Sequence, residues 1–250
     1  MRLVRLLPLV LGVLAGTGCG AAGPSNRHTP PVANRAPATA RYVSLRRAAA
    51  VARPAAVRPP AITWDPIPFG AVRRAQTVAY VRRHYHSFMA PTWRLRHPHV
   101  IVIHYTEASY GATFNTFASD LPDSELHELP ATSAHFVIDS NGLIHQLVSL
   151  GTIARHTVGL NWTAIGIEHV GYSDGQVLDN RRQMSASLHL VHWLQCRFGI
   201  PTRDVIGHAE SLSSPYHRED VPRLRTQTHS DFLHPDAQIY RRRLRALGGC

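Results

Sequence analysis

The stretch Val100-Ile-Val-Ile-His104-Tyr-Thr106 is a run of β-branched residues that ends at a histidine. Such runs favour buried strands, so we expect a buried strand that delivers His104 at its end. Two further runs have the same design, Ile165-Gly-Ile-Glu168 and Val205-Ile-Gly-His208. A rigid strand end holds a side chain in place. The three stretches therefore predict a sheet that carries His104, Glu168 and His208.

The rest of the chain alternates helical and strand patterns. Residues 134–138 and 143–148 predict a hairpin around Asn141-Gly142, because Asn-Gly favours the tight turn. Helices are predicted at about residues 71–84, 110–117 (helix or loop), 179–198 and 235–247, the third ended by Gly199. In the first helix, Val72, Ala75, Val78, Ala79 and Arg82 recur at helical spacing. This alternation predicts an α/β fold, a single domain with a central mixed β-sheet flanked by helices.

The amino terminus predicts export. Arg2 and Arg5 precede a short apolar stretch that ends at Gly16-Thr-Gly-Cys19. A cysteine after small residues predicts a lipoprotein signal over residues 1–19 with a lipid at Cys19; the alternative is cleavage near Ala21 or Ala22 and free secretion. Residues 20–60, rich in Ala, Pro and Arg, predict a disordered tether. Residues 61–250 form the folded domain, which we expect in the cell envelope as a monomer.

Charge and cysteines set weaker limits. A net charge of +11 suits an anionic cell wall, acidic lipid or nucleic acid, or only a solvated arginine-rich surface. No compact basic motif supports a nucleic-acid partner. Export permits a disulfide between Cys196 and Cys250, but the helical pattern around Cys196 favours a buried free cysteine.

The ionisable residues predict a catalytic zinc site. A hydrolytic zinc needs three N or O ligands and an open position, which His104, His208 and His229 would provide. Glu168 is the spare carboxylate. At the end of an apolar strand its pKa should be raised, which suits a general base or acid. The chain has 17 histidines, so position rather than residue type carries this prediction.

These motifs together resemble the zinc-dependent N-acetylmuramoyl-L-alanine amidases, the amidase-2 group related to peptidoglycan recognition proteins. The resemblance runs from about Ile67 to Leu247. It includes Ser133-Ala-His135-Phe-Val-Ile-Asp139-Ser-Asn-Gly142 and Arg155-His156-Thr-Val-Gly159 beside the three strand motifs. It implies the fold of that group, Zn²⁺ as cofactor and peptidoglycan as substrate.

The chain departs from the family at the third ligand, which is commonly Asp or Cys before Pro-Gly with a lysine two residues earlier. Alignment on Phe232 puts His229 in the ligand position and Gln227 in place of the lysine. Asp231 is the rival ligand, or else a partner that orients a ligating histidine. Oxyanion stabilisation would then come from zinc, Gln227, Arg225 or His156.

The resemblance also implies a mechanism. Zinc lowers the pKa of its water, Glu168 takes the proton, and the amide between the muramic lactyl group and L-alanine is hydrolysed as Glu168 protonates the amine. His156 would lie in the cleft. His135, Tyr105 and Trp162 are candidate substrate contacts, and packing roles remain open for all three.

Two other functions remain open. The first is a non-catalytic peptidoglycan-binding protein of the same fold, which release of peptides from muropeptide would exclude. The second is a basic protein that binds nucleic acid or a lipid surface and whose histidines are incidental. Steeply salt-dependent DNA binding without zinc would favour that second function.

Overall fold

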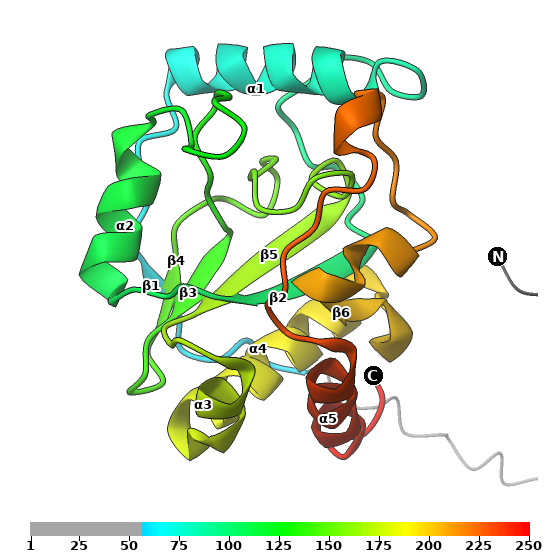
Figure 1. Cartoon of the computed structure of the whole chain (residues 1–250). Coiled ribbons are helices and arrows are strands. Elements are labelled where there is room, and N and C mark those ends of the chain that lie inside the picture. The colour runs from blue at the N-terminus through cyan, green and yellow to red at the C-terminus, as the bar shows by residue number, and fades with distance from the viewer. Residues whose placement is uncertain (1–56) are drawn as a thin grey trace, which may run out of the picture. The chain divides into compact units, whose positions relative to one another are not determined.

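A computed structural model describes residues 57–250, so the predicted signal sequence, the lipid site at Cys19 and nearly all of the predicted tether lie outside the described residues. Figure 1 shows a sheet between helices. The strands are β1 (Thr63–Trp64), β2 (Val100–Tyr105), β3 (Phe136–Ile138), β4 (Ile144–Gln146), β5 (Ala164–His169) and β6 (Val205–Gly207). The helices are α1 (Ala71–Tyr85), α2 (Tyr110–Ser119), α3 (Asp174–Asp179), α4 (Arg181–Phe198) and α5 (His234–Arg245), with short 3₁₀ turns at Thr202–Asp204, His208–Ser213 and Pro222–Leu224.

The six strands form one mixed sheet in the order β1-β4-β3-β5-β2-β6. Only the hairpin pair β3 and β4 is antiparallel. The interior strand β2 runs parallel to β5 on one side and to the edge strand β6 on the other. The predicted α/β fold with a central mixed sheet is therefore confirmed.

Apolar burial on both faces explains the central strands. Val100, Ile101, Val102 and Ile103 are at most 1% exposed. Each such side chain contributes about 1.5–3 kcal/mol when it leaves water. Helix α1 lies on one side of the sheet, and α3, α4 and α5 lie on the other (Figure 1). A strand with helices on both sides has no polar face, which is why β2 reads as a continuous apolar run.

Helix α1 corrects the predicted apolar face. The buried residues are Arg73, Thr77, Tyr80, Val81, His84 and Tyr85. Val72, which the helical pattern placed in the core, is 71% exposed. The buried face can include polar side chains because partners far along the chain satisfy them. Arg73, for example, donates to the carbonyl of Phe117 at 2.7 Å and pairs with Asp120.

The other helices and the hairpin agree more closely with the sequence. Gly142 takes a positive φ of 87°, and its N–H donates to the carbonyl of Asp139 at 2.9 Å. Gly199 ends α4 in the left-handed region, as a glycine stop does. The helix predicted over residues 179–198 is α4, which begins at Arg181 after an Asn180 cap, and the short helix α3 before it was not predicted.

The two cysteines near the carboxyl end are joined. A disulfide links Cys196 in α4 to Cys250, across 54 residues of chain. The expectation of a free buried cysteine is wrong, because Cys250 returns past the end of α5 and meets Cys196. Among residues 57–250, no helix is both long and apolar enough to span a membrane.

Candidate active site

Strand register brings three predicted residues to one edge of the sheet. His104 of β2 pairs with Glu168 of the parallel strand β5. Ile103 pairs with Gly207, so His208 follows β6 directly beside His104. Neighbouring strands lie about 4.8 Å apart, and residues paired in register share a face. The site therefore begins as a row of three side chains across β5, β2 and β6.

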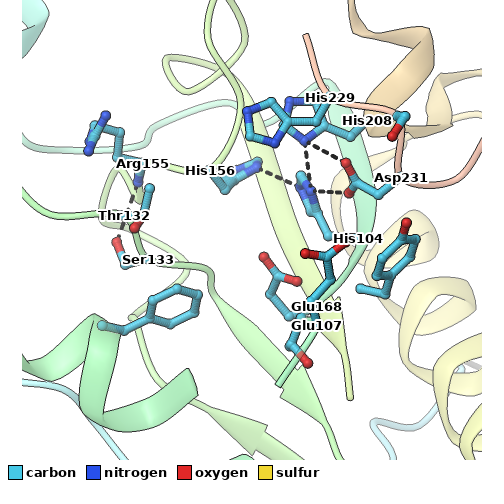
Figure 2. Close-up of a pocket in the computed structure, with 14 residues that line it drawn as sticks. His104, Glu107, Thr132, Ser133, Arg155, His156, Glu168, His208, His229 and Asp231 are labelled. Atoms are coloured by element: carbon cyan, nitrogen blue, oxygen red, sulfur yellow. Dashed lines mark hydrogen bonds and ion pairs between the residues drawn. The ribbon is translucent and has the colours of Figure 1, made fainter. Parts of the chain in front are cut away.

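The segment before α5 adds a fourth side chain, Asp231. Phe232 is fully buried at a φ of 52°, and its N–H donates to the Asp174 carboxylate at 2.7 Å. The carbonyl of Asp231 accepts from the N–H of Ala209 at 3.0 Å. These contacts turn the chain sharply and direct the Asp231 carboxylate at the two histidines (Figure 2).

His104, His208 and Asp231 form a compact donor cluster. The two Nδ1 atoms lie 3.1 Å apart. The Asp231 oxygens lie 3.0 Å from Nδ1 of His104 and 3.2 Å from Nδ1 of His208. Donors of a tetrahedral zinc site are about 3.3 Å apart at zinc–ligand distances near 2.0 Å. Two imidazole nitrogens and one carboxylate oxygen at these separations fit zinc in chemistry and spacing.

Burial and mutual charge govern the protonation of this cluster. Burial raises the pKa of Asp231, but hydrogen bonds from His104 and His208 outweigh burial and hold that pKa far below its ordinary value. Burial lowers the pKa of His208 to about 4, in spite of its bond to Asp231. Burial also lowers the pKa of His104, but Glu168 and Asp231 raise it above the usual value. Asp231 is thus an anion that faces two imidazoles whose pKa values are shifted in opposite directions.

Glu168 lies beside the cluster with an unsatisfied oxygen. Its Oε2 is buried and has no hydrogen-bond partner among the described residues. Burial raises the pKa of Glu168 to about 7, and the charge of His104 opposes that rise. A carboxyl with such a pKa exchanges a proton near neutral pH. This environment confirms the expectation of a partly desolvated carboxylate.

His156 contacts the outer nitrogen of His104. Its Nδ1 lies 3.2 Å from Nε2 of His104 and 2.9 Å from Oγ1 of Thr157. Burial and the neighbouring imidazoles hold the pKa of His156 well below its ordinary value. A neutral His156 can accept the Nε2 hydrogen of His104, which leaves Nδ1 of His104 free to ligate. The ring lies over Gly166, where any Cβ would come within 2.5 Å of it.

The predicted third ligand His229 lies outside the donor cluster. Its ring stacks on His208 at 4.7 Å, and its Nε2 bonds to Glu125 at 2.9 Å. Glu125 also accepts from the amide of Gln227 at 3.1 Å. The structure thus brings Asp231, the rival, rather than His229, to His104 and His208. The carboxylate of Glu125 already takes the N–H of Gln227 that was expected for an oxyanion.

A cavity of about 290 Å³ opens over the cluster. Tyr105, Glu107, Arg155, His156, Glu168 and His229 lie on its wall with the three donors. Arg155 is itself buried and donates to the carbonyl of Pro130 at 2.6 Å, so it braces the wall. Gln227 lines a smaller adjoining cavity of about 60 Å³. The larger cavity, which lies over the donors, has room for a small polar group there and opens to solvent for the rest of a larger substrate.

The sequence matches one known protein family. Residues 94–229, more than half of the chain, match the amidase-2 family model, described as N-acetylmuramoyl-L-alanine amidase. The chain belongs to the amidase-2 family. Membership supports a peptidoglycan amidase, a hydrolase acting on amide bonds. No curated protein matches the chain.

Several solved amidase structures are also similar to the chain. The endolysin amidase LysCS of Clostridium intestinale URNW is 19% identical at a TM-score of 0.41, over 61% of this chain and 83% of its own. AmpD, solved as a selenomethionine derivative, is 17% identical at a TM-score of 0.45. The match covers 72% of this chain and 93% of AmpD. AmiD of E. coli, solved with anhydro-N-acetylmuramic acid-L-Ala-D-gamma-Glu-L-Lys, is 22% identical at a TM-score of 0.37. The match covers 56% of this chain and 61% of AmiD.

Two expected substrate contacts of this amidase are corrected. His135 is fully buried; its Nε2 bonds to the carbonyl of Thr152 at 3.0 Å, and its Nδ1 accepts from the N–H of Gly166 at 3.1 Å. Trp162 lies outside the cavity wall, donates to the carbonyl of Gly159 at 3.2 Å and packs edge-on against Phe88. His135 thus braces β5, and Trp162 packs against the core. Tyr105 does line the cavity, as expected.

Sequence reasoning missed Glu125, Glu107 and Thr157. Thr157 lies within the motif Arg155-His156-Thr-Val-Gly159, and a hydroxyl next to His156 could have indicated its hydrogen bond to that ring. Glu125 sits in a loop more than 100 residues before its partner His229, so no local pattern pointed to it. Glu107, two residues after β2, has a positive φ of 51°, which only the structure reveals.

Proposed function

We propose that this amidase is zinc-dependent and hydrolyses the amide bond between N-acetylmuramic acid and L-alanine in peptidoglycan. The observation that carries the proposal is the convergence of His104, His208 and Asp231 beside Glu168 in one cavity. Three ligands with a carboxylate alongside is the composition of a catalytic rather than a structural zinc site. His229 and Gln227 line that region but would not ligate.

Each residue has a separate task in this proposal. Bound zinc would supply Lewis acidity, which polarises a carbonyl and makes a water more acidic. Glu168 accepts the proton of the attacking water and returns it to the leaving amine, which its raised pKa permits. His156 fixes the tautomer of His104, and Asp174 holds the backbone that presents Asp231. Tyr105 is the remaining candidate for a substrate contact.

We further propose that the protein works outside the cytoplasm, in the cell envelope. The Cys196–Cys250 disulfide supports this location, because disulfides persist in oxidising compartments. The exported amino-terminal pattern agrees with it. The lipid at Cys19 and the monomeric state stay predictions. Mass spectrometry of the membrane fraction would detect the acylated amino terminus.

The test replaces Glu168 by glutamine, which keeps shape and removes the titrating group. Wild-type protein should release stem peptides with a free L-alanine amino group from purified muropeptide, and Glu168→Gln should lose at least about 100-fold in rate. Bound zinc and peptidoglycan affinity, measured on the same samples, should stay unchanged. If both proteins bind muropeptide equally and neither releases peptide, the protein is a binding protein of this fold and the enzymatic proposal fails.

A further inference from the structure

A second group of metal-ligating side chains lies on α4, away from the cleft. His192, Cys196 and Cys250 place one ligand atom each within 4.8 Å of the others. His192 and Cys196 are four residues apart on one helix, so their side chains share a face. None of the three belongs to the cavity wall of the amidase site.

The imidazole of His192 has no other task among the described residues. Its Nε2 is buried and has no hydrogen-bond partner there. A buried polar nitrogen without a partner carries a cost of about 1–3 kcal/mol. An unsatisfied imidazole nitrogen in a group with two cysteine sulfurs is the donor arrangement of an N/S metal site.

We propose that reduction of the Cys196–Cys250 disulfide converts this group into a site for a thiophilic divalent metal such as Zn²⁺. A dithiol reductant supplies two electrons and two protons, becomes a disulfide, and leaves thiols on Cys196 and Cys250. The metal displaces both thiol protons and binds two thiolates and the neutral imidazole of His192. Two thiolates balance the charge of a divalent ion, and imidazole with thiolate is a ligand set that zinc favours.

The metal would replace the disulfide as the link between Cys250 and α4, so the link exists in both the oxidised and the reduced protein. Either the disulfide or the metal ties Cys250 to α4, and therefore ties the end of α5 to its neighbour. Helix α5 begins three residues after Asp231, so this connection steadies the element that follows the third ligand of the amidase site. The chain would thus keep α5 in place before its cysteines are oxidised.

Cobalt is the probe, because thiolate-to-cobalt charge transfer reports sulfur ligation and is silent at a His-His-Asp site. The full chain carries Cys19→Ser, so that Cys196 and Cys250 are the only cysteines. Oxidised protein should show no charge-transfer band. Protein reduced with dithiothreitol and desalted without oxygen should bind one additional Co²⁺ and gain the band.

Paired variants test the role of His192. Outer partners of ligands alone are worth about 10- to 100-fold in metal affinity, so His192→Ala should weaken the additional site by at least about 100-fold. His189→Ala, exposed on the same helix, should leave it unchanged. Circular dichroism of each reduced variant confirms that α4 is folded. No additional Co²⁺ in reduced protein, or equal affinity in His192→Ala and the parent, overturns the proposal.

Discussion

Asp231 contacts both imidazoles of the cluster, one with each carboxylate oxygen. His229 lies against the outer face of His208 and gives its Nε2 to Glu125 instead. The Asp231 carboxylate therefore lies where it can ligate a metal together with the two imidazoles, and its charge balances that of the metal. The His229 ring does not lie where it can ligate. This difference separates the two candidates for the third ligand.

Removal of Asp231 and removal of His229 should change zinc affinity to very different extents. Asp231→Ala should weaken zinc binding by at least about 100-fold, since a direct ligand is worth more than the outer partners that cost about 10- to 100-fold. His229→Ala should change zinc affinity by less than about tenfold. Competition with a chromophoric chelator measures both. The assignment is wrong if His229→Ala loses zinc and Asp231→Ala keeps it.

Local sequence explains why part of this site could be predicted. His104, Glu168 and His208 follow β-branched runs, and parallel strands in register place them together. Asp231 lies in irregular chain, where Phe232 adopts a φ of 52° and Asp174 holds its N–H. No periodicity records that turn, so sequence could name His229 and Asp231 but not choose between them.

Gly207 controls the approach of this irregular segment. A Cβ on Gly207 would lie 1.9 Å from the carbonyl oxygen of Phe232, which is backbone and cannot rotate away. We expect Gly207→Ala to cost about 1–3 kcal/mol of unfolding free energy and to weaken zinc binding, because Asp231 moves with Phe232. Urea unfolding and chelator competition measure the two effects. Gly111→Ala, where a Cβ meets nothing within 4 Å, is the matched control and should not destabilise the protein.

At the scale of elements, His84 joins α1 to two distant segments. Its Nδ1 lies 2.9 Å from Glu219 and its Nε2 2.9 Å from Glu128. Both nitrogens face carboxylates, so the ring must carry two hydrogens to satisfy them. Burial lowers the pKa of His84, but the hydrogen bonds and charges of Glu128 and Glu219 outweigh burial and raise it above the ordinary value.

This arrangement predicts a pH-dependent stability. Because the folded-state pKa is above the unfolded value of about 6.5, the stabilisation is complete below pH 6.5 and is lost as pH rises through the folded pKa. Urea unfolding across pH 5 to 9 should show this loss in wild type and not in His84→Gln. His189→Gln, an exposed position, should behave as wild type. Equal pH profiles for wild type and His84→Gln would contradict the charged state of His84.

The same contacts show why the face of α1 could not be predicted. Helical periodicity pointed to Val72 and Ala75, which are exposed. The helix buries Arg73 and His84 instead, because Asp120, Glu128 and Glu219 reach them from other parts of the chain. The helix and its ends were predictable from local patterns. Its orientation depends on ion pairs that join residues far apart in sequence.

At the scale of the whole molecule, the disulfide closes a long loop. It joins residues 54 positions apart and holds the end of α5 against α4. Chain-entropy arguments assign a loop of this length about 4 kcal/mol of stabilisation through the unfolded state. The double variant Cys196→Ser/Cys250→Ser should lose about that much in urea unfolding under oxidising conditions. Equal stability of the variant and the oxidised parent would show that the unfolded chain is not restrained.

The zinc dependence of amide hydrolysis tests the central claim most directly. Oxidised protein is stripped with a chelator and titrated with Zn²⁺, and the release of stem peptide from purified muropeptide is followed by mass spectrometry. The stripped protein should be inactive, and activity should rise to a plateau at one equivalent per chain. Full peptide release by metal-free protein, or saturation with zinc and no release, would contradict a zinc amidase built on His104, His208 and Asp231.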